Sequence, residues 1–428
     1  MQSTILSLLN QPAELEKLYR KDSSAFKKSF LEVYDSIKDD AVAVCWYERL
    51  TYTAINAEAQ AESDSKIKKV LPLVILLSLI AGTVAKIPQY FNFGYPLEEQ
   101  FYARNISLIV FPFLAIYFAI KNKLSVKAWG VIGFLFVSGA LYINLVTKFN
   151  LGDAAGVNAT SNLSLIHFPL FCWAILGLAY TFNSNPVSSR LSYLRFNGDI
   201  AILTAIILTV GGMLTGITIG LFELIGFDIA EFYFKYIVIY GIAAAPIVAT
   251  YILDLNPLLV SRVSPVVARV FSPLVLITLI AYLGALAFSK KDPFHDRDFL
   301  LFFNILLIGV LAIIFFAIVE GYSRNRGKVQ RIVLFALSAV TIIVNGIALT
   351  AIIFRIGNWG FTPNRLAVLG GNLLFLIHLI LISIGLFKSL NNTDAIEKVD
   401  ATIAKFLPVY AAWTVVVTFI FPLIFGFK

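Results

Sequence analysis

Two groups of charged residues stand beside long apolar runs and could do chemistry. One is a polar segment, residues 355–365, in which Arg355 and Arg365 flank Trp359. The other follows the fifth apolar run and consists of three acids, Glu223, Asp228 and Glu231. A guanidinium and a carboxylate at low dielectric make a strong, directional contact, and an arginine can equally bind an anionic ligand. A structural cluster at the helix ends is favoured, and a ligand-binding or gating site is the alternative.

The segment 355–365 has the pattern of a boundary between two helices. Thr362 is a good N-cap, and Pro363 suits the first helical position because its missing N–H costs nothing there. The residue before a proline is driven out of the α region, so Thr362 should be extended and a helix should begin at Pro363. Arg365 then places a cation in the first turn against the helix dipole, which predicts an acidic or anionic partner. The candidate ligand-binding or gating residues of this segment are Arg355, Trp359, Thr362, Asn364 and Arg365.

A row of small residues within the fifth apolar run predicts helix packing. Gly212, Gly216 and Gly220 recur every four residues, which gives a smooth stripe that a neighbouring helix can approach closely. Glu223 follows one turn later and either serves a function within the membrane or pairs with Lys235 near its surface. Further acids on the same expected side of the membrane are Asp292, Asp296 and Asp298.

Composition places the chain in a membrane. Of its 428 residues, 59% are hydrophobic and 14% charged, against roughly 45–50% and about 25% in soluble domains. The net charge of +8 arises from basic residues in the loops, which membrane topology and anionic headgroups explain better than nucleic acid does. Three histidines and two cysteines are too scattered for a zinc motif or a disulfide framework. The sequence predicts no metal site and no cofactor.

The elements that position these residues are apolar runs of membrane-spanning length, about 20 residues each. Residues 1–68 are polar and predict a soluble helical region, and residues 69–428 form the polytopic transmembrane domain. The expected fold is an all-α integral membrane protein, a bundle of about eleven transmembrane helices with a small helical cytoplasmic N-terminal region. The runs are 70–87, 106–121, 128–147, 163–182, 200–226, 232–253, 266–288, 299–320, 331–354, 364–387 and 406–426.

The distribution of Lys and Arg predicts the orientation. Basic residues are in excess in the N-terminal region and in the loops on its side of the membrane, and the excess is modest once that region is set aside. The positive-inside rule then predicts a cytoplasmic N-terminus and a C-terminus outside.

Three functions remain open at this stage. The first is a transporter-like protein with a polar path near the fifth, ninth and tenth spans, lined by Glu223 and by Asn345 or Asn372. The second is a membrane scaffold or sensor whose residues 1–68 bind a cytoplasmic protein partner. The third is a membrane-embedded enzyme acting on a lipid or lipid-linked substrate. The absence of a phosphate-cradling loop, a nucleophile elbow and paired catalytic carboxylates weakens the enzymatic reading.

The segment 355–365, Arg-Ile-Gly-Asn-Trp-Gly-Phe-Thr-Pro-Asn-Arg, resembles a signature of a bacterial family of multi-spanning membrane proteins, domain-of-unknown-function family 4153. In that family an Arg-Ile pair, an aromatic-Gly step and Thr-Pro-x-Arg link two late transmembrane helices. The resemblance covers this segment and the general hydropathy. It implies a bacterial inner (plasma) membrane location, with no assigned chemistry and no catalytic residue.

Overall fold

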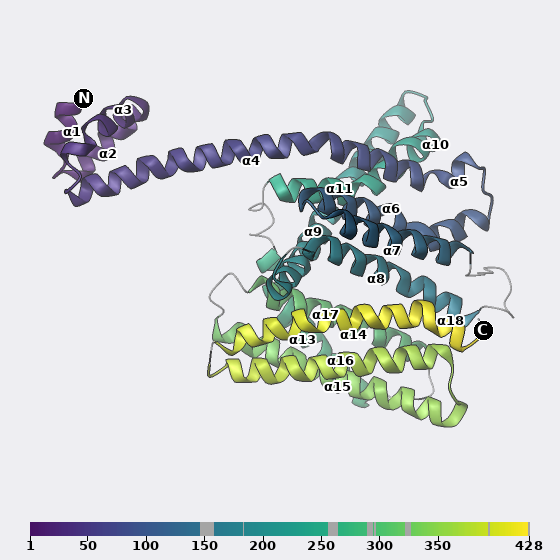
Figure 1. Ribbon diagram of the computed structural model, residues 1–428. Coiled ribbons are helices and arrows are strands. Elements are labelled where there is room, and N and C mark those ends of the chain that lie inside the picture. The colour runs from purple at the N-terminus through teal and green to yellow at the C-terminus, as the bar shows by residue number, and fades with distance from the viewer. Residues whose placement is uncertain are drawn as a thin grey trace. The chain divides into compact units, whose positions relative to one another are not determined.

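The computed structural model describes residues 1–145, 158–182, 184–255, 264–288, 294, 297–321, 327–392 and 394–426, with the backbone alone described at 52–69, 264–267 and 297–300. The regular structure of these residues is helical throughout, as Figure 1 shows. The predicted all-α membrane fold is confirmed. The chain divides into two compact units, Met1–Pro72 and Leu73–Lys428.

The first unit has a small hydrophobic core of its own. Its core side chains include Phe26, Phe30 and Trp46, which lie together in aromatic contact. The side chain of Asp22 accepts a hydrogen bond from the Ala25 amide and caps a helix start. The elements are α1 (Gln2–Leu8), α2 (Pro12–Lys21), α3 (Ser23–Val33), a 3₁₀ turn η1 (Tyr34–Ser36) and the beginning of α4 (Ala41–Ala85).

The second unit is a bundle in which helices distant in sequence lie side by side. Helix α8 contacts α6, α7, α9 and α17, and α16 packs against both α15 and α17 (Figure 1). The elements after α4 are α5 (Ile87–Tyr90), α6 (Leu97–Lys121), α7 (Val126–Leu145), α8 (Ala159–Thr181), α9 (Pro186–Leu224), α10 (Ala230–Tyr233), the π-helical turn η2 (Phe234–Val238), α11 (Ile239–Leu255), α13 (Ser264–Phe288), α14 (Arg297–Glu320), α15 (Lys328–Trp359), α16 (Pro363–Ser389), α17 (Ala395–Val415), the π-helical turn η3 (Val416–Ile420) and α18 (Phe421–Ile424).

Within the described residues, ten helices are long and apolar enough to cross a bilayer. An eleventh apolar stretch, Val70–Ala85 in α4, is shorter. In order along the chain, these correspond to the eleven apolar runs of the sequence, so the protein crosses the membrane many times and is embedded in lipid.

The polar segments before the fifth and the last apolar runs, which we expect to be connectors, are partly helical and continuous with the spans that follow them. Helix α9 begins at Pro186, because Asn185 caps the amides of Val187 and Ser188 and Pro186 occupies the first helical position. The result is one helix of 39 residues that contains most of the polar connector 183–198. Helix α17 likewise begins at Ala395, ahead of the last apolar run.

Prolines near the C-terminus leave carbonyl groups for other helices. Pro422 has no N–H, so the carbonyl of Thr418, four residues earlier, has no donor from that position. Instead it accepts hydrogen bonds from the Ser164 hydroxyl at 2.7 Å and the Tyr142 hydroxyl at 3.1 Å. Helices α7 and α8 are thereby tied to the π-helical turn η3.

Candidate functional site

The segment between α15 and α16 has the backbone that its sequence predicts. Helix α15 ends at Trp359, and Gly360 has φ 73°, a conformation that favours glycine. Thr362 is extended (φ −134°, ψ 157°), and its hydroxyl accepts the Arg365 amide at 3.3 Å. The predicted N-cap at Thr362 and the helix start at Pro363 are confirmed.

Arg365 has a different partner from the one expected. Its Nη1 donates to the carbonyls of Trp359 at 2.8 Å and of Gly360 at 2.7 Å. The last carbonyls of a helix lack intrahelical donors and carry the negative end of its dipole, so they serve in place of an acid. Among the described residues the expected acidic side-chain partner is not found, and an anionic ligand at Arg365 stays a prediction. Arg365 closes the turn between the two helices.

The aromatic ring of Trp359 lies beside both arginines of the segment. The guanidinium carbons of Arg355 and Arg365 are each 5.8 Å from its centroid, within the range of a cation–π contact. Arg355 Nε also donates to the Phe294 carbonyl at 2.9 Å. Asn364 is exposed, and its role as a ligand-binding residue stays a prediction.

The three acids after the fifth span do not meet these arginines. Glu223 is exposed at the end of α9, Asp228 accepts the Ala230 amide at 3.1 Å, and Glu231 forms an ion pair with Lys235. The proposed cluster of these acids with Arg365 is wrong, since each group is satisfied locally or solvated. Asp292 and Asp296 lie outside the described residues, as does the side chain of Asp298.

The glycine stripe is not covered by another helix of the described chain. A Cβ atom added at Gly212, Gly216 or Gly220 would meet nothing within 4 Å. Only 6% of the most apolar window of α9 is buried. The predicted close packing is therefore not made among the described residues, because this half of α9 lies at the outside of the bundle.

The side-chain amide of Asn345 in the ninth span bonds to the backbone of the tenth span. Asn345 Nδ2 donates to the Asn372 carbonyl at 3.0 Å, and both side chains are buried. Neither residue, nor Glu223, lines either of the two cavities that the structure describes. The polar path near the fifth, ninth and tenth spans therefore gains no support from these cavities. Interhelical bonding accounts for Asn345 Nδ2, whereas Asn345 Oδ1 and Asn372 Nδ2 are buried without a described hydrogen-bond partner.

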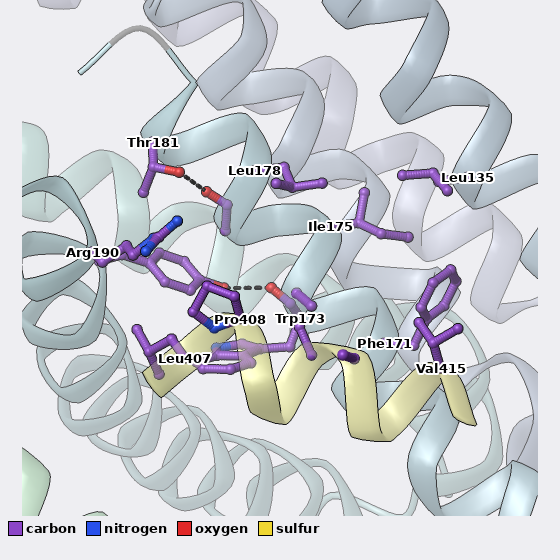
Figure 2. Close-up of a pocket in the computed structure, with 15 residues that line it drawn as sticks. Leu135, Phe171, Trp173, Ile175, Leu178, Thr181, Arg190, Leu407, Pro408 and Val415 are labelled. Atoms are coloured by element: carbon purple, nitrogen blue, oxygen red, sulfur yellow. Dashed lines mark hydrogen bonds between the residues drawn. The ribbon is translucent and has the colours of Figure 1, made fainter. Parts of the chain in front are cut away.

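A different site lies between α7, α8, α9 and α17. It is a cavity of about 360 Å³, which we call the slot, lined by fifteen residues. Figure 2 shows Arg190 and Thr181 at one end of the slot and Leu135 and Val415 at the other. Its volume falls within the roughly 300–1,000 Å³ typical of small-molecule sites.

A proline positions the arginine of the slot. Pro408 in α17 has no N–H to give to the carbonyl of Ala404, four residues earlier. The Arg190 Nη1 atom, from the N-terminal part of α9, donates to that carbonyl at 3.3 Å. A guanidinium has five donor hydrogens, so this single bond fixes Arg190 and leaves most of its donors available.

The polar side chains of the slot other than Arg190 bond to protein atoms. Tyr193 Oη donates to the Trp173 carbonyl at 2.7 Å, and the Trp173 indole donates to Asn197 Oδ1 at 2.8 Å. Thr181 Oγ1 donates to the Gly177 carbonyl at 2.7 Å. The bonds of Tyr193 and Trp173 tie α8 to α9, that of Thr181 lies within α8, and together they occupy the polar donors of the slot wall.

The slot extends along α8 from one end of the helix to about its middle. From Thr181 to Phe171 the wall follows ten residues of α8, which at 1.5 Å each is about 15 Å. The hydrocarbon core is about 30 Å thick. Leu178, Pro408 and Ala412 are exposed along the slot, so it opens sideways, where acyl chains lie in a bilayer.

The charges of the slot suit binding better than acid–base catalysis. Arg190 is the one member of the fifteen lining residues that is charged at neutral pH, and no carboxylate or imidazole is among them. General acid–base chemistry uses such groups within hydrogen-bond reach of the substrate.

A second, polar cavity of about 310 Å³ lies at the same end of α8 and α9. Its wall includes Lys121 and Asn122 as well as four serines of residues 184–192. Lys121 is paired with Asp254 at 2.6 Å, and Asn122 Nδ2 donates to the carbonyls of Ala179 and Tyr180. These polar groups hold the end of α6 against α8 and α11.

No family model matches this chain, and no curated protein or solved structure does. Function is therefore inferred from the geometry of the slot and of the segment 355–365.

Arg190 is not among the residues that the sequence pattern singles out. One signal in the sequence is the pair Asn185-Pro186, which predicts a helix start within the polar connector. A helix that starts there contains Arg190 and continues into the fifth span. A second signal is Pro408, which leaves a carbonyl in need of a donor from another helix.

Proposed function

We propose that the protein is transporter-like and takes the hydrocarbon chain of a lipid or lipid-linked molecule from the bilayer into the slot. The observation that carries the proposal is the lateral opening of an apolar cavity that extends over about half the thickness of the hydrocarbon core. A polar solute would need hydrogen-bond partners in that cavity, and the polar side chains other than Arg190 already donate to protein atoms.

This proposal keeps the transporter-like class and changes the path. The fifth span, α9, contributes to the slot, while α7, α8 and α17 replace the ninth and tenth spans. It also retains the lipid or lipid-linked substrate of the enzymatic hypothesis without assigning a reaction. With the N-terminus in the cytoplasm, the Arg190 end of the slot faces the inner leaflet, and the resemblance of residues 355–365 supports a bacterial inner membrane.

Fluorescence quenching of Trp173, a slot-wall residue, tests the proposal. Two full-length variants each retain one tryptophan, Trp173 or the exposed Trp359, with the others replaced by phenylalanine. Both are placed in nanodiscs of ordinary phosphatidylcholine, and a fatty acid with a brominated chain is added in steps. We expect Trp173 quenching to saturate at a low mole fraction, because the slot holds a chain, while Trp359 quenching rises in proportion to the bromine content.

Quenching of Trp173 that follows the same proportional course as that of Trp359 would contradict chain binding in the slot. Bromine quenches at short range, so the comparison separates a retained chain from random contact with the surrounding lipid.

A scaffold or sensor role is the second candidate, and the separate core of the first unit favours it. Side chains such as Phe26, Phe30 and Trp46 are buried within residues 1–50, which is what a docking module for a cytoplasmic protein partner requires. Deletion of residues 1–60 should abolish co-purification of such a partner while the transmembrane bundle still inserts. Unchanged co-purification would exclude this role.

A further inference from the structure

The slot combines a long apolar wall with one cationic end. Its other polar side chains, Thr181, Tyr193 and Trp173, donate to protein oxygens and leave few donors for a ligand. Arg190 makes one described side-chain hydrogen bond, a long one of 3.3 Å to a carbonyl. Among the lining residues, the donors that a ligand can use are therefore concentrated at this single guanidinium.

No acid in the slot wall neutralises this arginine. The fifteen lining residues contain no aspartate or glutamate, and the contacts described for Arg190 include no ion pair. The next residue after Ala404 is Lys405, which is exposed and adds a second positive charge along α17. A cation at the polar end of an apolar cavity favours an anionic oxygen group there, and a guanidinium can bind such a group through two parallel hydrogen bonds.

The cationic end of the slot and its apolar wall are placed so that one amphiphilic molecule can contact both. Arg190 lies at the end of α8 marked by Thr181, and the apolar wall continues for about 15 Å toward Phe171. An anionic group held at Arg190 would therefore place an attached chain along the slot, with its far end near the middle of the bilayer.

We infer that the slot selects an amphiphile with an anionic oxygen headgroup, a carboxylate or a phosphate, bound at Arg190, and an unsubstituted hydrocarbon chain along α8. This inference rests on the proposed function, since it specifies which chain-bearing molecules the slot prefers. A hydroxyl or amide within the chain is disfavoured, because it would meet a wall whose donors are already occupied.

The test compares brominated probes that share a chain and differ in the headgroup. The full-length variant that retains only Trp173 is titrated in nanodiscs with a brominated fatty acid above its pKa, with its methyl ester and with a brominated monoacyl phosphate. We expect each anionic probe to quench at a mole fraction about tenfold or more below that of the ester, because hydrogen bonds between charged groups are the stronger ones. The two anionic arms distinguish a carboxylate from a phosphate as the preferred group.

Two substitutions distinguish binding of the anionic group at Arg190 from general attraction of anions to basic residues of the protein. Arg190→Gln keeps a donor for the Ala404 carbonyl and removes the charge, and it should give the anionic probes and the ester equal quenching. Lys127→Gln is the matched control, since Lys127 is an exposed cation at the start of α7 that does not line the slot. It should leave the preference unchanged.

The outcomes are distinct for the two proposals. Equal quenching by the ester and the anionic probes in the unsubstituted slot would overturn the inference and leave chain binding intact. A preference that survives Arg190→Gln would also overturn it, whatever the result with Lys127→Gln. Absence of saturable quenching by every probe would overturn both proposals.

Discussion

Arg190 in α9 donates a hydrogen bond to the carbonyl of Ala404 in α17, and that carbonyl is the one that Pro408 leaves without an intrahelical donor. A proline in one span thus fixes a cation from another helix at the mouth of the slot. The relationship links a substitution in α17 to the binding of a headgroup at α9.

Pro408→Ala is expected to weaken the preference of the slot for anionic probes. Alanine restores an N–H that can bond to the Ala404 carbonyl within α17, so Arg190 loses its fixed position and must be ordered by the ligand itself. The ratio of quenching between the brominated fatty acid and its methyl ester measures the effect. A ratio equal to that of the unsubstituted protein would show that Pro408 does not position Arg190.

Removal of both hydroxyls at the Thr418 carbonyl is expected to destabilise the bundle more than the sum of the single changes. Either Ser164 or Tyr142 can satisfy the carbonyl alone, whereas Ser164→Ala with Tyr142→Phe leaves a buried acceptor unpaired at a cost of about 1–3 kcal/mol. Thermal unfolding in detergent of the two single variants and the double variant measures the coupling. Strictly additive shifts would mean that the two hydroxyls do not share this acceptor.

Gly370→Ala is expected to destabilise the packing of α16 on α17. A Cβ atom there would lie 2.1 Å from the Trp413 ring, so the tryptophan must move, and overpacking typically costs about 1–3 kcal/mol. Gly371→Ala is the matched control in the same helix, because its nearest contact would be an ordinary 3.8 Å. The thermal midpoint should fall for Gly370→Ala alone, and equal midpoints for both variants would contradict the close approach.

The ion pairs of Glu16 give the first unit a small dependence on pH. The hydrogen bonds from Arg49 and Arg20 lower the pKa of Glu16 below its ordinary value. A carboxyl whose pKa is lower in the folded state contributes stability above its unfolded pKa, and that contribution is lost as the pH falls through the folded pKa. In a titration of the full chain with ¹³C-labelled glutamate, the Glu16 resonance should have its midpoint below that of Glu16 in the variant with Arg49→Gln and Arg20→Gln. Coincident midpoints would contradict the pairing.

The sequence predicts the helical architecture well because length and apolarity determine which segments cross a bilayer. The start of α16 at Pro363 was predictable too, since Thr362 and Pro363 act through local backbone geometry alone. The partner of Arg365 was not, because the residue pattern does not reveal that the carbonyls of Trp359 and Gly360 lie within reach.

The slot could not be predicted from the sequence either, because it depends on how helices distant in the chain pack together. Arg190 stands in a polar connector, and only the packing of α9 on α17 brings it to the Ala404 carbonyl. The glycine stripe shows the opposite case, in which a strong local pattern at Gly212, Gly216 and Gly220 finds no partner within the described chain. Tertiary contacts, rather than residue spacing, determine both the position of Arg190 and whether the glycine stripe is covered.

The sideways mouth of the slot has a consequence for how its occupant is supplied. A molecule that enters from the hydrocarbon arrives by two-dimensional diffusion within a single leaflet, so occupancy follows the mole fraction of that species among its lipid neighbours. Extraction of the protein into micelles would then replace the resident molecule by mass action, and its identity is best sought before the native membrane is dissolved.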